Sequence, residues 1–232
     1  VDYSGFEMPV SYDGLKVEHA SVREKVGMFD VSHMGEFTIK GEDALEVLQN
    51  ITTNDVSKLN DGKIQYSCIP NGKGGIVDDL LIYRMSEGNY MLVVNASNND
   101  KNWAWVNGVL NGTVRVSADL LQLRIPSTNV QLRDLRAESS GADQRVDIAL
   151  QGPKSRNILL SLGGHADDLA RVKNMPWAAI TTATLGGFDL IISRTGYTGE
   201  RIAYEVFPHP DDAPALFQKL VDLGAVPCGL AA

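Results

Sequence analysis

The chain has 232 residues and a formal net charge of −8, with 44% hydrophobic and 22% charged residues. This length allows a sizeable core and one or two domains, and the composition is ordinary for a globular protein. The acidic balance argues against a nucleic acid or an anionic membrane surface as partner, because both require a basic face. No stretch approaches the ~18 consecutive apolar residues of a membrane span.

Cysteine and histidine usage gives no sign of a metal site. The two cysteines, Cys68 and Cys228, lie far apart in the sequence and are expected to be free thiols. The four histidines are scattered, and no Cys or His pair has the spacing of a zinc site. We therefore expect no structural or catalytic metal.

The first elements alternate between helix and strand. Hydrophobic periodicity predicts a helix over 15–27, followed by a strand over 35–40 and an amphipathic helix over 42–51. The expected inner face of the first helix consists of Leu15, His19, Val22 and Val26.

The middle of the chain reads as a hairpin with further short elements. Strands over 64–69 and 76–85 flank the sequence PNGKGG, whose Asn71-Gly72 pair is a strong turn signal. Three elements are predicted to follow: a strand over 89–97, a helix from Asn99 and a strand over 112–117. The polar stretch 119–145 gives no clear pattern.

The last part again mixes strands and helices. The predicted elements are a strand over 146–152, a helix over 152–164, strands over 188–193 and 204–208, and a helix over 211–224. Frequent hairpin connections favour an α+β fold of antiparallel sheets with flanking helices over a doubly wound parallel sheet.

The sequence GGIVDDLLIY places two adjacent carboxylates, Asp78 and Asp79, at the start of a predicted strand. Neighbouring side chains of a strand point to opposite faces, so the two acids cannot act as one pair. Asp79 shares a face with Leu81 and Tyr83, where a half-buried carboxylate could bind an amine or stabilise a cation. Alternatively, both acids complete the turn and cap backbone amides in solvent. On this stretch alone both interpretations stand.

A second unusual stretch is SRTGYTGE, with two glycines around Tyr197 and a carboxylate at Glu200. Such a turn brings the backbone close to a neighbour, although a simple hairpin turn has the same composition. It lacks the residues of a P-loop or a dinucleotide fingerprint. A third stretch, DVSHMGE, contains His33, which we expect to be a hydrogen-bonded structural group.

Taken together, eight collinear motifs resemble one family, the T-protein (aminomethyltransferase) of the glycine cleavage system. The motifs are GFEMPVSY (5–12), MFDVSHMGE (28–36), NDVSKL (54–59), GGIVDDLLIY (74–83), LVVNASN (92–98), ALQGPKS (149–155), SRTGYTGE (193–200) and PCGLAA (227–232). Several are weak alone, but in this order they are specific and span nearly the whole chain.

The resemblance implies a folate-dependent one-carbon transfer. In the family, the methylene of an aminomethyl group on the lipoyl arm of the H-protein passes to tetrahydrofolate, and ammonia is released. The implied partners are therefore lipoylated H-protein and tetrahydrofolate. The implied location is the cytoplasm of a bacterium, or the mitochondrial matrix of a eukaryote.

The resemblance also implies a set of site residues. The essential acid of the family falls on Asp79, and its pterin-holding glutamate falls on Glu200. The other folate-lining positions implied are Met34, Tyr66, Tyr83, Asn95 and Tyr197. A pterin displays a row of N–H donors, which a carboxylate can accept in pairs.

The family fold implies a discontinuous folate-binding domain of about 1–50 plus 145–232, with an inserted α+β domain over 51–144 that carries the catalytic aspartate. The chain departs from the family by Ala203 in place of a glycine. We also expect it to be truncated at both ends and to lack the family's C-terminal β-domain.

Two other functions remain open. A related folate-dependent demethylase, or a sarcosine- or dimethylglycine-type enzyme, would share the pterin pocket but use another one-carbon donor. A non-catalytic folate-binding module is the second alternative, although the K-G-C-Y-x-G-Q turn of such relatives is absent here.

Overall fold

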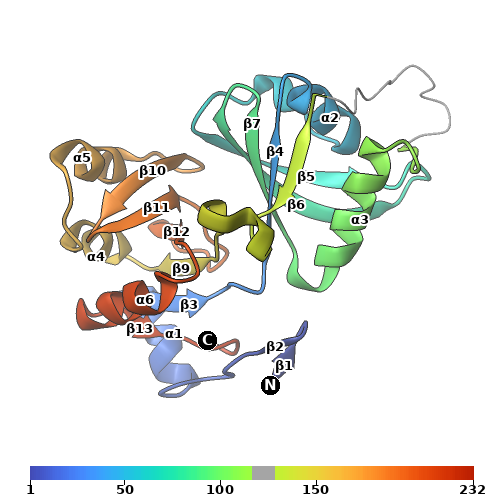
Figure 1. The fold of residues 1–232 in the computed structure, drawn as a ribbon. Helices are drawn as coiled ribbons and strands as arrows, with labels where there is room; N and C mark the ends of the chain where they lie inside the picture. The colour runs from blue at the N-terminus through green and yellow to red at the C-terminus, as the bar shows by residue number, and fades with distance from the viewer. Residues whose placement is uncertain (117–128) are drawn as a thin grey trace. The chain divides into compact units, whose positions relative to one another are not determined.

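The computed structural model describes residues 1–116 and 129–232, and the chain divides into two compact units (Figure 1). Unit 1 comprises Val1–His33 and Gly141–Ala232, and unit 2 comprises Met34–Ser140. The first boundary was expected near residue 50 and instead lies between residues 33 and 34. The reason is strand pairing: β4 (Gly35–Lys40) is hydrogen bonded between β7 (Asn89–Val94) and β8 (Gln131–Asp134), so it belongs to unit 2.

Unit 1 is built on a six-stranded sheet with the strand order β10-β11-β12-β9-β3-β13. Its strands are β3 (Gly27–Asp30), β9 (Ile148–Gln151), β10 (Ile180–Leu185), β11 (Phe188–Ser193), β12 (Ala203–Phe207) and β13 (Val226–Pro227). All neighbouring strands are antiparallel except β3 and β13. A separate hairpin pairs β1 (Asp2–Tyr3) with β2 (Phe6–Glu7).

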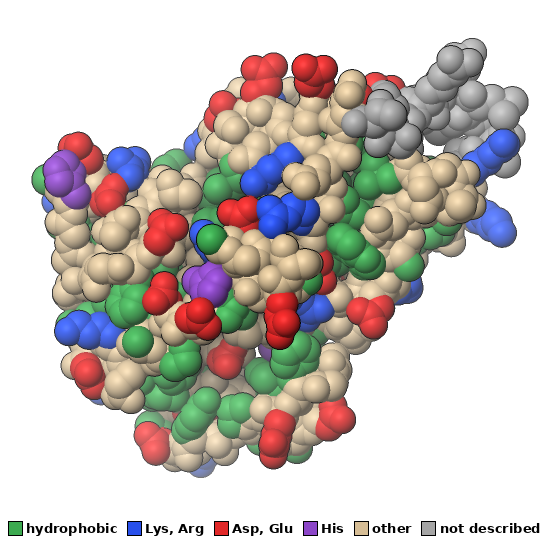
Figure 2. Space-filling model, in the orientation of Figure 1, with side chains coloured by type: hydrophobic (Ala, Val, Ile, Leu, Met, Phe, Trp, Pro, Cys, Tyr) green, Lys and Arg blue, Asp and Glu red, His purple; other side chains and the backbone are tan. Residues whose placement is uncertain are grey.

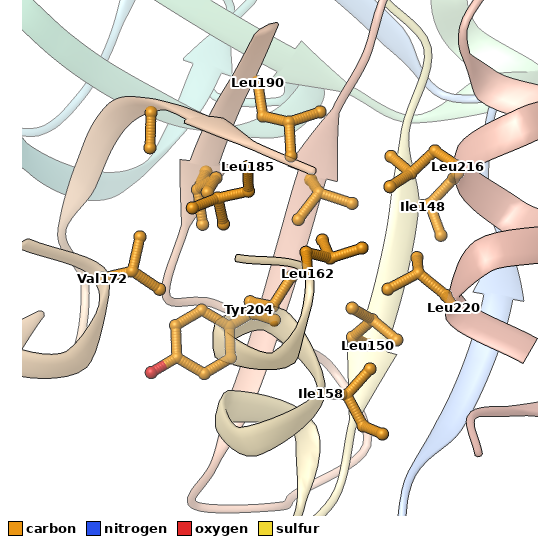
Figure 3. Packing of buried hydrophobic residues seen from close by; sticks show 14 of the residues in the cluster. Ile148, Leu150, Ile158, Leu162, Val172, Leu185, Leu190, Tyr204, Leu216 and Leu220 are labelled. Atoms are coloured by element: carbon orange, nitrogen blue, oxygen red, sulfur yellow. The ribbon is translucent and has the colours of Figure 1, made fainter. Parts of the chain in front are cut away.

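Three helices cover one face of this sheet: α4 (Ser155–Ser161), α5 (Ala166–Asn174) and α6 (Ala213–Asp222). Figure 3 shows Leu216 and Leu220 of α6 facing Ile148 and Leu150 of β9. Tyr204 pairs with Leu150 across the sheet and is equally buried. Burying each such side chain contributes about 1.5–3 kcal/mol. Successive side chains of a strand point to opposite faces, so the polar residues that alternate with these buried side chains lie on the other face of the sheet.

Helix α1 (Leu15–Glu24) presents a different face from the one expected. Leu15 is 50% exposed and His19 is exposed, whereas Glu18 and Val22 are buried. Glu18 is turned inward because its carboxylate accepts three backbone N–H bonds, from Tyr12 (2.6 Å), Gly14 (2.9 Å) and Gly229 (2.8 Å). Periodicity cannot reveal this, because an acid counts as polar in any hydrophobic pattern.

Unit 2 is built on a five-stranded antiparallel sheet with the order β5-β6-β7-β4-β8, which includes β5 (Lys63–Pro70) and β6 (Ile76–Ser86). Helices α2 (Ala44–Ile51) and α3 (Asn99–Leu110) pack on one face, as Figure 1 shows. The core between them contains Phe37, Ile39, Leu48, Ile82, Leu92 and Val106, each with 0% exposure. Short 3-10 turns occupy Val56–Lys58, Ala96–Asn98 and Glu138–Asp143.

The expected α+β architecture with antiparallel sheets is confirmed, but one predicted strand is wrong. Residues 112–116 form turns and bends, and Ser117 lies outside the described residues. Much of the stretch that gave no pattern, 119–145, also lies outside them as far as residue 128. Its described part contains β8, which completes the sheet of unit 2 beside β4.

Three general properties complete the description of the fold. None of their helices has the length and apolar character needed to cross a membrane. Cys68 and Cys228 are both free thiols, as expected. Acidic side chains are spread over the face drawn in Figure 2, in keeping with the net charge of −8.

Candidate functional site

Strand β6 separates the two adjacent aspartates, as the alternation predicted. Asp78 lies on the same side as Leu80 and Ile82, which face the core of unit 2, and it is only 8% exposed. Asp79 lies on the other side, opposite Cys68 of β5. The alternative in which both acids cap backbone amides in solvent is wrong, because their hydrogen-bond donors are side chains of the same unit.

Asp78 is surrounded by side-chain amides. Its Oδ1 accepts N–H bonds from Asn95 (3.0 Å) and Asn98 (2.9 Å), and its Oδ2 accepts one from Asn102 (2.5 Å). Asn98 lies just before α3 and Asn102 lies in its first turns, so the helix start is directed at this carboxylate. Three donors offset the cost of burying the charge.

Asp79 is held between an amide and a phenol. Its Oδ1 accepts an N–H bond from Asn95 (2.8 Å), and its Oδ2 accepts the hydroxyl hydrogen of Tyr66 (2.8 Å). This hydrogen bond from Tyr66 raises the pKa of the Tyr66 hydroxyl to about 12, with smaller contributions from burial and from Cys68. Tyr66 therefore stays protonated and Asp79 is the acceptor.

Strand register explains why these residues meet. Val94 of β7 pairs with Gly35 of β4 on one side and with Leu80 of β6 on the other. Asn95 after β7 and Met34 before β4 therefore lie at the same sheet end as Asp79. The structure thus brings Tyr66, Asp79 and Asn95 into hydrogen-bond contact and places Met34 at the neighbouring strand end.

Tyr83 lies farther along β6, on the same face as Asp79, as expected from the alternation of side chains. It is fully buried and pairs with Ile64 and Met91 of the flanking strands. Tyr66 by contrast is 52% exposed. Of the two tyrosines, only Tyr66 combines solvent access with a direct contact to Asp79.

Unit 1 contributes a second group of residues, in the loop after β11. The Glu200 carboxylate forms an ion pair with Arg23 of α1 at 2.6 Å, and the same guanidinium donates to the Thr198 carbonyl at 2.7 Å. The Thr198 hydroxyl donates to Oε1 of Gln151 at 2.9 Å. A side chain at Gly196 would collide with that same oxygen, since its Cβ would lie 2.1 Å away. The loop is therefore tied to α1 and β9 and is more than a simple hairpin turn.

A hollow of about 410 Å³ lies against this loop. Its lining consists of Trp177, Gly196, Gly199, Glu200 and Arg201. Trp177 is half exposed and lines the same hollow as Glu200, a combination that suits a flat ring with N–H donors at its edge. Tyr197 at the tip of the loop is 73% exposed.

The predicted site residues thus fall into two groups, one in each unit. Glu200 and Tyr197 belong to unit 1, and the five others belong to unit 2. That the two groups share one ligand remains a prediction. Among the described residues, no three His, Cys, Asp or Glu side chains are grouped so as to hold a metal ion.

Sequence reasoning missed Glu205 and the role of Arg23. Glu205 is 8% exposed on β12 and accepts hydrogen bonds from the hydroxyls of Ser193 and Thr195. It points to the face opposite the helices, because its strand neighbours face the core of unit 1. The sequence did contain a signal for Glu205, because an acid in the middle of the strand AYEVF is as unusual as Asp78 in β6.

His33 is buried, as expected of a structural group, and the hydrogen bond expected for it stays a prediction. Its ring is 7% exposed and makes edge contacts with Tyr3 (5.2 Å between ring centroids) and Phe6 (6.4 Å). These contacts fasten the β1–β2 hairpin to unit 1.

Comparison with known families gives a match over the complete chain. The family model described as the GCVT N-terminal domain matches residues 1–232. The aminomethyltransferase of Flavobacterium psychrophilum is 42% identical over 237 residues, and that of Deinococcus deserti is 43% identical over 233 residues. Both alignments cover 100% of this chain but only 58% and 57% of the relative, so the chain spans little more than half the length of these curated proteins.

Solved structures show the same fold. The glycine cleavage system aminomethyltransferase T of Bartonella henselae superposes with a TM-score of 0.80 at 29% identity, covering 100% of this chain and 56% of that one. The heterotetrameric sarcosine oxidase of Corynebacterium sp. U-96 gives a TM-score of 0.54 at 14% identity over 90% of each chain, a likeness of fold alone.

Proposed function

The chain belongs to the GCVT N-terminal domain family, and from this we propose that it carries the folate site of an aminomethyltransferase of the glycine cleavage system. The reaction would pass methylene from aminomethyl-lipoyl H-protein to tetrahydrofolate, with release of ammonia. The observation that carries the proposal is the Asp79 carboxylate, held by Tyr66 and Asn95 at one end of the sheet of unit 2.

The reaction needs no change of oxidation state at the protein. Two nitrogens of tetrahydrofolate each form a bond to the transferred carbon, and each loses one proton. One of these protons completes the ammonia that leaves, and the other completes the thiol of the lipoyl arm. Asp79 is fixed in place before the reaction, so its negative charge stabilises the positive charge that develops at the transferred carbon without further reorganisation. Tyr66 and Asn95 keep the carboxylate in one orientation, because each donates to a different oxygen.

The residues of unit 1 suit the pterin of the proposed substrate. The Glu200 carboxylate accepts N–H donors, and the half-exposed Trp177 offers a flat surface beside it. Arg23 contacts only one of the two carboxylate oxygens, Oε1. The other oxygen, Oε2, makes no hydrogen bond to a described residue and is available to a ligand.

The test is an assay of the full-length protein that contains this chain. With aminomethyl-lipoyl H-protein as donor, we expect tetrahydrofolate-dependent release of ammonia and formation of 5,10-methylenetetrahydrofolate. Absence of turnover with a correctly folded, folate-binding protein would contradict the proposal.

A second arm separates the related folate enzymes. The same protein is given small methylated amines, such as sarcosine and dimethylglycine, in place of the H-protein donor. We expect no folate-dependent turnover of these amines. Turnover of an amine but not of the H-protein donor would assign the site to the demethylase alternative, and folate binding without turnover of any donor would assign it to a non-catalytic module.

A further inference from the structure

The amide of Asn95 connects the two aspartates of β6. Its Nδ2 lies 3.0 Å from Oδ1 of Asp78 and 2.8 Å from Oδ1 of Asp79. A side-chain amide carries two N–H donors, so one can serve each carboxylate. Asn95 lies just beyond the end of β7, from where its side chain reaches both acids although they belong to opposite faces of β6.

We propose that Asp78 is a positioning residue that acts through Asn95 on Asp79. The buried carboxylate fixes the Asn95 amide, and the fixed amide in turn orients the carboxylate that faces the reacting groups. The catalytic consequence rests on the proposed function, whereas the geometric coupling between the three side chains does not.

We call the chain of contacts from Asp78 through Asn95 to Asp79 the relay. Hydrogen-bond chemistry determines how its central amide is oriented. An ionised carboxylate is only an acceptor, so the amide must turn its nitrogen towards both acids. Its carbonyl oxygen then points away from them, and Oδ1 of Asn95 makes no hydrogen bond to a described residue. The Asp79 carboxylate and the Asn95 carbonyl are thereby two kinds of acceptor at the same end of the sheet, which suit a ligand with N–H donors.

Asp78 is itself held more firmly than Asp79. It is 8% exposed and is contacted by Asn98, which precedes α3, and by Asn102 in the first turns of that helix. Asp79 has no such anchor, because its two donors are Asn95 and the half-exposed Tyr66. In Asp78→Asn one of the two acceptor oxygens becomes an N–H donor, so the three asparagine amides can no longer all donate to residue 78. The Asn95 amide is then held less firmly on that side, and the Asp79 carboxylate that it contacts is less firmly positioned.

Tyr66 provides a readout that does not depend on activity. The hydrogen bond to Asp79 raises the pKa of the Tyr66 hydroxyl to about 12, and Cys68 is the other titratable group that acts on it. A displaced Asp79 would let the Tyr66 pKa fall towards the ordinary value of about 10. The titration is followed by the ¹³Cζ tyrosine NMR signal of the chain, assigned with Tyr66→Phe.

The decisive variant is Asp78→Asn, and the matched control is Asn102→Ala. The control removes a partner of Asp78 that touches neither Asn95 nor Asp79. We expect the Tyr66 midpoint to fall by about one to two pH units in Asp78→Asn and to stay in place in the control. A folded Asp78→Asn variant with an unchanged Tyr66 titration would overturn the proposal, and so would an equal fall in the control.

A second variant covers the case in which Asp78→Asn does not fold. Asp78→Ala/Asn102→Leu removes the carboxylate together with its most deeply buried amide partner, and replacing both partners by apolar groups is often close to neutral for stability. The same fall of the Tyr66 midpoint is expected. An unchanged midpoint in this folded variant refutes the relay.

Kinetics of the full-length enzyme then test the catalytic consequence. Asp78→Asn should lower kcat by about 10- to 100-fold with little change in the KM for tetrahydrofolate, because misplacing a reacting group by about 1 Å has an effect of this size. A shifted Tyr66 titration in a protein that lacks aminomethyl transfer altogether would reject the proposed function and keep the relay. An unshifted Tyr66 titration in an enzyme that does transfer the aminomethyl group would reject the relay and keep the proposed function.

Discussion

Arg23 and Glu200 form an ion pair of 2.6 Å that joins helix α1 to the loop after β11. The contact engages Oε1 of Glu200 and leaves Oε2 without a hydrogen bond to a described residue. The side chain of Glu200 is 20% exposed, so a ligand can reach the second oxygen while the ion pair persists. Under the proposed function, the pair would orient the carboxylate that binds folate and would not need to break during binding.

Replacing Glu200 by Gln should weaken tetrahydrofolate binding by about 1–3 kcal/mol, since a neutral amide cannot reproduce charge-assisted bonds from two N–H donors. Isothermal calorimetry on the full-length protein measures the loss. Glu24→Gln, an exposed acid at the end of the same helix α1, is the control and should bind normally. Unchanged affinity in Glu200→Gln would mean that the residue serves only the loop.

Binding near Glu200 should also be visible in tryptophan fluorescence. Trp177 lines the same hollow and is half exposed, whereas Trp103 and Trp105 pack against the core of unit 2. We expect tetrahydrofolate to quench the emission of Trp177, and Trp177→Phe to abolish most of the quenching. Full quenching in Trp177→Phe would place the ligand elsewhere.

Asp79→Asn should lower kcat by about 10²-fold or more while changing tetrahydrofolate affinity little, as for the removal of one preorganised electrostatic group. Asparagine keeps the shape and removes the charge. Steady-state kinetics of the full-length enzyme measure this, with Glu87→Gln, an exposed acid in the turn after β6, as control. A loss confined to KM would show that Asp79 contributes to binding only.

Glu18→Gln should destabilise unit 1 by about 2–3 kcal/mol, because an amide cannot accept all three backbone N–H bonds that the buried carboxylate receives. Urea unfolding at neutral pH measures the change. Glu24→Gln again serves as the control, being exposed on the same helix. Equal stability of the two variants would contradict the role of the buried carboxylate.

The same residue predicts how stability depends on pH. Burial alone would raise the pKa of Glu18, but the N–H donors of Gly229, Tyr12 and Gly14 outweigh it, and the pKa lies below its ordinary value of 4.5. A lowered folded-state pKa gives stability that is fully present above the ordinary value and is lost as the pH falls through the folded value. The stability difference between wild type and Glu18→Gln should therefore shrink on acidification below about pH 4. A difference that stays constant down to pH 2–3 would exclude this linkage.

Much of the fold could be predicted from local pattern. The hairpin around Asn71-Gly72 and the alternation in β6 were correct, because turn chemistry and strand period are local properties. The inner face of α1 was wrong, since Glu18 is buried by backbone donors that include Gly229, more than 200 residues away in sequence. The first domain boundary was wrong for a similar reason: β4 pairs with strands that come much later in the chain.

The site could be predicted only in part. Opposite orientations for the two aspartates followed from strand geometry, but the side chains that surround Asp78 did not. Three asparagine side chains converge on Asp78, and of these only Asn95 was singled out in the sequence. Glu205 and Arg23 were missed because their importance depends on which residues lie beside them in space.

The bond between Glu18 and the Gly229 amide has a consequence for how the chain is made. A ribosome completes unit 2 when Ser140 emerges, and that unit can fold at once from a continuous segment. Unit 1 cannot be completed until residue 229 has been synthesised. Until then Glu18 of α1 lacks the N–H donor of Gly229, which follows it by some 210 residues. A stalled or prematurely ended translation product would therefore expose unit 1 to proteolysis while unit 2 survives.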